Sequence, residues 1–485
     1  MTRRSSIGWR SLRSSIVAGT DAPAIMAPAA PVAASASADP VDGGSEAGRT
    51  TLRAELRQLW RGVQWTPTYV GFLLYVFVIT TYRLPLATVS IIIALGGLLF
   101  QRERLRFPSM LLWMVGFVAW AVIGYTQTIY QQAAWTQLEI LLKIIVIMFV
   151  AVNALRTPAQ VRFFMIFYLA CFALYPLRGA IFNYHFYGES LRGRAIWLHA
   201  YANPNDLAAL CLLQFSLALS LTITERGKWT RRAILVGLGL LPLLILMTQS
   251  RGAIIALFVT MSVLVATNWR HLKSVVPPRR RRQAALAAVA LVLIVSISAP
   301  DAVWGRMRGL TAATDTKRLE EVDPEGSAKQ RFEIWRVAVA VVAANPMLGV
   351  GVGVYPYEHT RFAELKAGFA TTAHGRRDPH STYLRVLAET GFPGLIAFIG
   401  CILAAVIPAE RVRRAARHRY PREALQILML QMGLFAYFLA GIFGSFAYLP
   451  FTYIHLVLIV SLTFLLRQRL RGTEFGAAVP ARRRG

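Results

Sequence analysis

The residue best placed for chemistry is a histidine at the end of a long polar stretch. His380 lies within Asp378–Leu384, just ahead of an apolar run that begins at Gly391. An imidazole accepts a proton from a hydroxyl group near neutral pH, so His380 is a candidate general base. A histidine that only forms structural hydrogen bonds is the alternative interpretation. We recognise no Asp-x-Asp motif and no His/carboxylate cluster beside it, so the sequence predicts no metal site.

A second set of candidates consists of arginines in connections between apolar segments. They occur in Leu191–Ala195, in Gln249–Ala253 and in the long polar stretch. A guanidinium presents paired N–H donors that match the oxygens of a phosphate group. For any single arginine, the alternative is that its charge reaches up to the lipid headgroups. Because three separate connections each supply cations, a shared anion site is the favoured interpretation for Arg192, Arg194, Arg251, Arg331 and Arg336.

The stretch Tyr201–Asp206 predicts the start of a helix. Asn203 or Asn205 is a suitable N-cap, and the charge of Asp206 is favourable in a first helical turn. We expect this capping role whether or not the same residues take part in a site.

Composition places these candidates in a membrane protein. Of the 485 residues, 55% are hydrophobic and only 16% are charged, whereas soluble domains carry roughly 25% charged residues. The formal charge of +29 lies in short Lys and Arg clusters between apolar runs, which membrane topology explains and which argues against nucleic-acid binding.

The apolar runs predict an all-α polytopic membrane protein with about twelve transmembrane helices. These predicted spans are Thr66–Thr81, Leu84–Phe100, Ser109–Tyr130, Leu138–Leu155, Val161–Phe182, Asn205–Thr224, Ala233–Thr248, Ile254–Thr267, Ala284–Ala299, Gly391–Pro408, Leu425–Phe446 and Phe451–Leu466.

Positive charges alternate between the predicted connections. Lys and Arg are concentrated in every second connection, which the positive-inside rule assigns to the cytoplasm. Both termini are then cytoplasmic, and the connections that carry His380 and the arginines above lie on the other side. The predicted regions are a disordered cytoplasmic tail (1–60), a membrane domain with the first nine helices (61–300), a large extracytoplasmic segment (301–390), the last three helices (391–470) and a second cytoplasmic tail (471–485). Within the large segment, the pattern from Ala328 predicts an amphipathic helix that ends near Asn345.

Several motifs carry a resemblance to a known family. His380-Ser381 is followed by nine residues, then Gly391, two residues and Gly394. This spacing resembles the motif of the bacterial O-antigen ligase/polymerase superfamily, at the place where that family has it. Further matches are Asn203-Pro-Asn-Asp206, Gln249-Ser-Arg-Gly252, Arg331-x-x-x-Trp335 and Asn345-Pro-Met-Leu-Gly-Val-Gly351.

The resemblance implies a GT-C-type membrane glycosyltransferase in the bacterial inner membrane, with a periplasmic active site and no metal or other cofactor. Its partners would be membrane lipids, an undecaprenyl-diphosphate-linked O-antigen as donor and lipid A-core as acceptor, and the new glycosidic bond would be inverted. His380 resembles the catalytic residue that activates the acceptor hydroxyl. Arg251, with one or both of Arg192 and Arg194, resembles the ligands of the donor diphosphate. Residues expected to support the site are Asn203, Asp206, Arg331 and Ser381.

The same motifs leave the acceptor open. The preferred interpretation is an O-antigen ligase, but relatives polymerise repeat units or transfer glycans to protein hydroxyls. A transporter of lipid-linked glycans is a more distant alternative. It would require paired charges, such as Glu139 and Lys143, within internal repeats, and we see no repeat.

Overall fold

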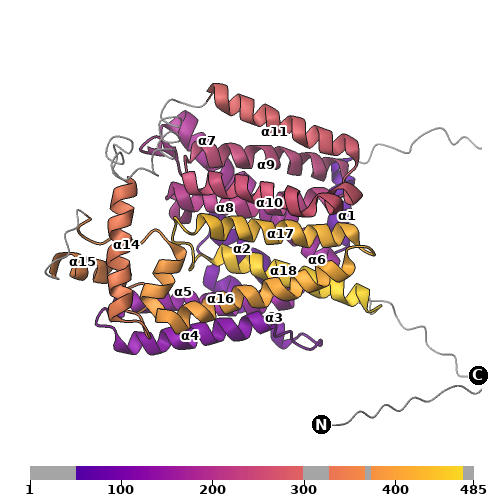
Figure 1. Ribbon diagram of the computed structural model, residues 1–485. Helices are drawn as coiled ribbons and strands as arrows, with labels where there is room; N and C mark the ends of the chain where they lie inside the picture. Colours follow the sequence, from indigo (N-terminus) through magenta and orange to yellow (C-terminus); the bar gives the residue numbers. More distant parts are fainter. Residues whose placement is uncertain (1–50, 299–326, 366–372, 473–485) are drawn as a thin grey trace, which may run out of the picture. The chain divides into compact units, whose positions relative to one another are not determined.

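The described part of the chain is built almost entirely from helices. A computed structural model describes residues 51–298, 327–365 and 373–472 (Figure 1). Its α-helices are α1 (Leu52–Arg61), α2 (Pro67–Thr81), α3 (Ala87–Leu99), α4 (Ser109–Gln127), α5 (Gln131–Ala154), α6 (Pro158–Phe172), α7 (Arg178–Phe182), α8 (Pro204–Thr224), α9 (Lys228–Met247), α10 (Arg251–Val275), α11 (Pro278–Ser298), α14 (Ser327–Ala344), α15 (Tyr355–Leu365), α16 (Thr382–Ala416), α17 (Pro421–Ala440) and α18 (Pro450–Leu470). Two π-helical segments, η1 (Ala173–Leu177) and η2 (Asn183–Tyr187), flank α7, and a 3₁₀ turn, η3 (His199–Tyr201), precedes α8. Two short strands, β1 (Ser190–Leu191) and β2 (Arg194–Ala195), form an antiparallel hairpin.

Every predicted span overlaps at least one of these helical segments. Among the described residues, nine helical segments are long and apolar enough to cross a membrane. The shorter apolar helices α2 and α3 match the first two predicted spans, with 15 and 13 residues. Helix α11 matches another predicted span, whose last residue lies outside the described ranges. The chain is therefore an all-α polytopic membrane protein, and the total of twelve spans stays a prediction.

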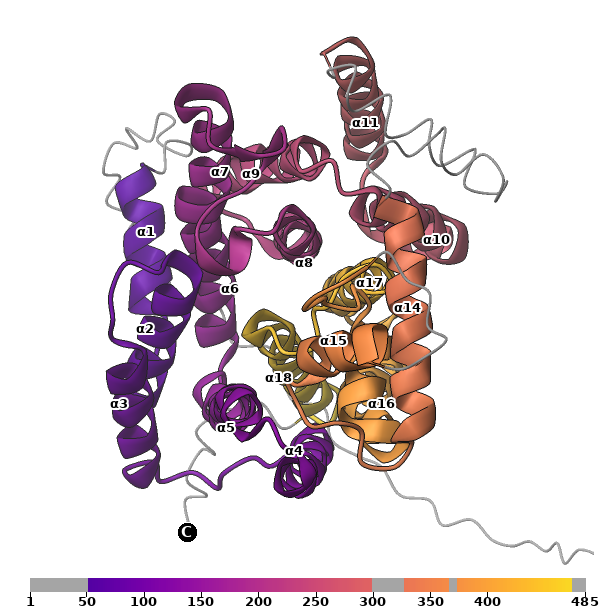
Figure 2. The same cartoon turned by 90° about the vertical axis from the view of Figure 1, so that its left-hand side faces the viewer.

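Helices α8, α17 and α18 form the buried centre of the bundle. In each of them 72% of the most apolar 18-residue stretch is buried, whereas the buried share in the other candidate spans is at most 50%. Figure 2 shows these three helices with the remaining spans around them. Where α8 meets α17, a Cβ on Gly433 would lie 1.9 Å from Ser216 Oγ, so only glycine permits this approach. The buried His455 on α18 contacts the Leu430 carbonyl of α17 at 2.9 Å and holds the third helix to the pair.

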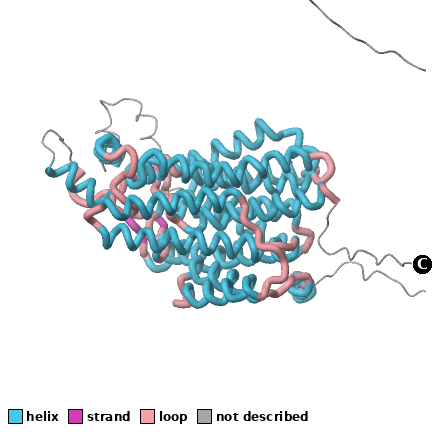
Figure 3. The backbone as a smooth tube through the Cα atoms, turned by 90° about the horizontal axis from the view of Figure 1, so that it is seen from below, coloured by secondary structure: helices cyan, strands magenta, loops and turns pink. Residues whose placement is uncertain are grey.

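The connections gather at two ends of the bundle. We call one the His380 end; it contains the residues before α8, α10, α16 and α18, and the hairpin lies among its loops (Figure 3). We call the other the Glu55 end; it contains helix α1 and the residues before α6, α9 and α17. Because the helices run alternately up and down, each end combines loops that are far apart in sequence.

Helix α1 corrects the predicted extent of the N-terminal tail. Residues 1–60 were expected to be disordered, but Leu52–Arg61 form a helix, and the preceding residues 1–50 lie outside the description. Glu55 on this helix accepts hydrogen bonds from the backbone N–H groups of Lys228 at 2.8 Å and Trp229 at 3.0 Å, which begin α9. The first N–H groups of a helix have no acceptor inside that helix, and the Glu55 carboxylate supplies one. Helix α1 is polar, so it leaves no apolar run in the sequence from which a span could be predicted.

The large polar segment contains its own small core. Residues 299–326 and 366–372 lie outside the description, but the predicted amphipathic helix is confirmed as α14. Ile334 and Val341 of α14 pack with Tyr355 and Phe362 of α15. The Tyr355 hydroxyl donates a hydrogen bond to the Ile334 carbonyl at 3.1 Å. Helix α14 also packs against α16, so this segment is attached to the start of the helix that follows His380.

Candidate active site

His380 is held in place by the first residues of α16. Ser381 is the N-cap of this helix, with a side chain that accepts from the Leu384 N–H. The next residue, Thr382, is fixed to the α17–α18 connection by three hydrogen bonds. Its N–H donates to the Gly441 carbonyl at 2.8 Å, its hydroxyl donates to the Gly444 carbonyl at 2.7 Å, and the hydroxyl oxygen accepts from the Phe446 N–H at 2.9 Å. The polar start of α16 is thereby anchored on two other helices.

The backbone at His380 is strained. Its φ of +47° lies in the left-handed region, which a residue with a side chain rarely adopts. Two contacts hold this conformation: Asp378 Oδ1 accepts from the His380 N–H at 2.8 Å, and the Trp335 indole donates to the Pro379 carbonyl at 2.8 Å. Trp335 also stacks on Phe443 with a ring separation of 6.2 Å. Strain that the surroundings maintain in this way is typical of functional sites.

A carboxylate that the sequence did not predict lies beside His380. Asp378 Oδ1 lies 3.7 Å from His380 Nδ1, and Ser445 donates a hydrogen bond to the same oxygen. The expectation that no His/carboxylate cluster exists here is therefore wrong. The signal was present in Asp378-Pro-His380, because a carboxylate two residues before a histidine can fold back onto it.

Asp378 is the first member of a longer charged network. Arg385 Nη1 lies 3.2 Å from Asp378 Oδ2, and Arg385 Nε lies 3.3 Å from Glu389 Oε1. Glu389 is fully buried and accepts a further hydrogen bond from the Tyr448 hydroxyl at 2.7 Å. Arg385 and Glu389 are four residues apart on one helix face, a spacing that could have revealed the pair in the sequence. A buried carboxylate with two such partners is satisfied, so the network is a rigid support for the His380 loop.

The environment of His380 favours its neutral form. Burial lowers its pKa from the usual value, Asp378 opposes this, and the nearby cations of Arg331, Arg377 and Arg385 lower it further. The net effect is a pKa below the ordinary range of histidine. An imidazole that is neutral at neutral pH has a lone pair available to accept a proton.

The two motif glycines have separate structural roles. Gly391 interrupts α16 with φ +66° and ψ −173°, a conformation essentially restricted to glycine. A Cβ there would lie 2.1 Å from the Met347 carbonyl oxygen. The turn Asn345–Gly351 docks onto this interruption, with the Phe392 N–H donating to the Pro346 carbonyl at 2.9 Å. At Gly394, a Cβ would lie 2.1 Å from Thr390 Oγ1 and 3.4 Å from the Trp120 ring. The two glycines of the motif therefore lie where α16 contacts the Asn345–Gly351 turn and Trp120.

The arginines before α8 belong to the hairpin. Strands β1 and β2 pair in the register Leu191 with Arg194, so Arg192 and Gly193 form the two-residue turn. Both have positive φ, +54° and +71°, as a type I′ turn requires. The Arg192 side chain is exposed at the tip of this turn.

Arg194 joins the hairpin to the arginine loop Gln249–Arg251. Its Nε donates to the Thr248 carbonyl at 2.8 Å, and its Nη2 donates to Asn205 Oδ1 at 2.7 Å. The Gln249 side chain returns a bond to the Gly193 carbonyl at 2.9 Å. Arg251 is the first residue of α10, directly after this loop. The predicted grouping of Arg194 with the Arg251 loop is therefore present in the structure.

The start of α8 connects the arginine loop with the histidine loop. The predicted N-cap is confirmed at Asn203, whose side chain accepts from the Asn205 N–H at 2.8 Å. Asn205 also accepts from Arg194, and the adjacent Asp206 interacts electrostatically with Asp378 and Arg385. Arg331 interacts in the same way with His380. The start of α8 is thus bonded to Arg194 and lies within electrostatic range of the residues that support His380, while Arg192 and Arg336 have exposed side chains.

Within the described residues, no group of three His, Cys, Asp or Glu side chains has a geometry suited to a metal ion. The cations of the site are arginines from different elements, among them Arg194 on the hairpin, Arg251 at the start of α10 and Arg331 on α14.

Fold and site together define a multi-pass helical membrane protein with a polar, arginine-rich centre built at one end of its helices. The family model described as O-antigen ligase matches residues 209–399, which include Arg251, Arg331, His380 and both motif glycines. The hairpin arginines and the start of α8 precede the matched range. No curated protein matches the chain. Over these residues the chain matches the O-antigen ligase-like superfamily, whose members are glycosyltransferase-like enzymes.

Proposed function

We propose that the protein is an O-antigen ligase that transfers a glycan from undecaprenyl diphosphate to a sugar hydroxyl of lipid A-core. The observation that carries this proposal is His380 on a strained, anchored loop, with Arg194 held at the start of α8 next to Asp206, which lies within electrostatic range of Asp378 and Arg385. His380 supplies a base for the acceptor, and the Arg194–Arg251 region supplies cations for an anionic leaving group.

The proposed reaction is a single displacement. His380 accepts the proton of the acceptor hydroxyl, and the hydroxyl oxygen forms a bond to the anomeric carbon of the glycan. The bond between that carbon and the diphosphate breaks, so the configuration inverts and the electron pair leaves with the diphosphate. Arg194 and Arg251 stabilise the negative charge that develops there, because a fixed guanidinium presents donors where the charge appears. Asp378 stabilises the imidazolium that forms on His380.

The proposed location follows from the distribution of Lys and Arg. Clusters of Lys and Arg occur in the short connections at the Glu55 end, which the positive-inside rule assigns to the cytoplasm. The His380 end is then periplasmic in a bacterial inner membrane, both termini are cytoplasmic, and the fold is of the GT-C type. A glycan that has already been moved across the membrane on its lipid carrier would reach the site from that side.

The transporter alternative is disfavoured by one ion pair. Lys143 Nζ lies 2.5 Å from Glu139 Oε1, and the two side chains are 51% and 49% exposed on the surface of α5. Charges that relay protons or ions through a membrane face the bundle interior or a water-filled cavity. This pair faces outward instead. Polymerase and protein O-oligosaccharyltransferase activities differ from ligase only in the acceptor, and no observation favours either.

The decisive experiment is transfer by the purified full-length protein in lipid vesicles. The donor is a defined undecaprenyl-diphosphate-linked glycan, and lipid A-core, free repeat units and a serine-containing peptide are offered separately. We expect glycan on lipid A-core alone, at the same rate in EDTA. Transfer only to repeat units or peptide would replace the ligase with the corresponding alternative. Loss of activity in EDTA, restored by one cation, would refute a mechanism that relies on arginines.

A disruption strain separates the acceptors in the cell. A ligase defect removes capped lipopolysaccharide and leaves long undecaprenyl-linked chains, whereas a polymerase defect leaves caps of a single repeat. We expect the first pattern.

A further inference from the structure

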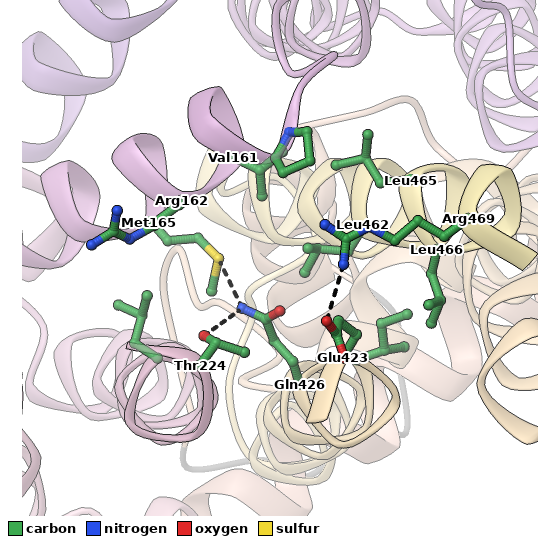
Figure 4. A pocket seen from close by; sticks show the side chains of 13 residues that line it. Val161, Arg162, Met165, Thr224, Glu423, Gln426, Leu462, Leu465, Leu466 and Arg469 are labelled. Atoms are coloured by element: carbon green, nitrogen blue, oxygen red, sulfur yellow. Dashed lines mark hydrogen bonds and ion pairs between the residues drawn. The ribbon is translucent and has the colours of Figure 1, made fainter. Parts of the chain in front are cut away.

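A cavity lies at the Glu55 end, away from the site described above. It has a volume of about 170 Å³ and is lined by the first turns of α6 and α17 and the last turns of α8 and α18 (Figure 4). Whole-ligand sites usually measure roughly 300–1,000 Å³, so this cavity has room for only part of a molecule.

The interior of the cavity is apolar. Its walls are aliphatic side chains from all four helices: Val161, Leu221, Ile427, Leu462, Leu465 and Leu466. The Gln426 amide is already bonded within the wall, donating to Thr224 Oγ1 at 3.3 Å. Such a lining accepts a hydrocarbon segment and gives no partner to a polar one.

The rim of the cavity carries charges of both signs. Arg162 lies on one side and contacts Glu225 through Nε at 2.9 Å and Nη2 at 2.7 Å. Arg469 lies on the other side, 3.0 Å from Glu423. The side chains of Arg162, Arg469 and Glu423 are between 35% and 44% exposed, whereas Glu225 is buried. The two Arg–Glu pairs have a net formal charge of zero. An anionic ligand would therefore be repelled by a glutamate, and a cationic ligand by an arginine.

Helix ends at this position place the rim at the level of lipid headgroups. Helices α6, α8, α17 and α18 are all candidate membrane spans, and each begins or ends at the cavity. A guanidinium has five N–H donors, so an arginine that is paired with one carboxylate retains donors for a phosphate. Glu423 offers an acceptor for an ammonium group a few atoms away from that phosphate.

We propose that this cavity is a binding site for one acyl chain of a zwitterionic aminophospholipid. The chain fills the apolar interior, the phosphate contacts Arg162 and Arg469, and the ammonium contacts Glu423. The lipid joins the ends of α6, α8, α17 and α18, and so stabilises the buried centre of the bundle. This site is independent of the proposed transfer reaction.

The test measures lipids that remain on the full-length protein. Protein is reconstituted in vesicles of equal phosphatidylethanolamine and phosphatidylglycerol, extracted in mild detergent and examined by native mass spectrometry. We expect one retained phosphatidylethanolamine per chain. Leu462→Trp fills the cavity and should lose it, while Leu403→Trp, on the exposed surface of α16, should keep it. Retention by Leu462→Trp, or retained phosphatidylglycerol in place of phosphatidylethanolamine, would overturn the proposal.

A charge variant tests the headgroup without changing the cavity. Glu423→Gln should weaken retention of phosphatidylethanolamine about tenfold, because it removes a charged hydrogen-bond acceptor. Glu410→Gln is the matched control, since Glu410 also pairs with arginines but does not line the cavity. If both variants retain the lipid equally, Glu423 does not hold the ammonium and the assignment to an aminophospholipid is wrong.

Discussion

The two ends of the bundle both contain capped helices but differ in their backbone conformation. At the Glu55 end the first turns of α9 and α6 are capped without backbone strain: Glu55 accepts from the N–H groups of α9, and Thr157 forms a capping box with Gln160 at α6. At the His380 end the backbone is strained. All five non-glycine residues with positive φ in the described ranges lie there: Tyr82, Arg192, His199, Gln249 and His380.

This difference separates stability from function. A residue held in a sparsely populated conformation costs of order 1–3 kcal/mol, and surrounding contacts have to hold it there. The three hydrogen bonds of Thr382 and the Arg385 network do so beside His380. Satisfied caps at the Glu55 end contribute stability without a role in chemistry. Variants at the His380 end should therefore change transfer, and variants at the Glu55 end should change only unfolding.

The largest effect is expected for His380→Ala. Loss of a general base should reduce the transfer rate by about 10²–10⁴-fold, while the protein still folds because the anchors are at Ser381 and Thr382. The rate is measured with purified protein in vesicles, and folding is followed by thermal unfolding in detergent. His374→Ala is the control, since His374 is exposed in the same segment. Full activity of His380→Ala would remove the base assignment.

A smaller loss is expected for Arg194→Lys. The Arg194 guanidinium bonds Thr248 and Asn205 through two different nitrogens, and a lysine supplies one point charge. We expect transfer to fall about 10- to 100-fold, as for the loss of one charged contact with its geometry. Arg192→Lys, at the exposed tip of the same hairpin, should lose less. The reverse order would assign the phosphate contact to Arg192.

The sequence is sufficient to predict most of the fold and half of the site. Long apolar runs give the spans, and the helix before Asn345 is apparent from its amphipathic pattern. The spacing of His380, Gly391 and Gly394 identified the His380 loop, although the reason for Gly391 is a contact with Met347, more than 40 residues away in sequence.

The remainder depends on contacts between distant segments. Nothing local in α1 shows that Glu55 reaches Lys228, so the predicted tail extended too far. Similarly, the support of Asp378 by Ser445 depends on how α17 and α18 fold back onto α16. The Arg385–Glu389 spacing was visible, but its meaning required knowing that Glu389 is fully buried.

Variants around His380 should shift the pH profile in opposite directions. Asp378 raises the pKa of His380, so Asp378→Asn should lower that pKa further and move the acid limb of the transfer rate to lower pH. Arg331 lowers the same pKa, so Arg331→Gln should move the limb to higher pH. Transfer rates of both variants are compared with the unmodified protein across pH 5–8, the range in which a histidine changes charge. Shifts in the same direction would show that the limb reports another group.

The smallest effect on transfer is expected for Glu55→Gln. Burial raises the pKa of Glu55, but hydrogen bonds from Thr230, Lys228 and Trp229 outweigh it and hold the pKa below the ordinary value. The charged cap therefore contributes stability above the unfolded-state pKa of a glutamate and loses it as the pH falls through the lower folded-state pKa. At neutral pH the variant should lose about 0.5–1 kcal/mol, as for a weakened helix cap, with an unchanged transfer rate per folded molecule. Thermal unfolding at neutral and acidic pH checks this, and the two proteins should converge in acid. A variant that melts normally but transfers poorly would mean that the two ends are coupled.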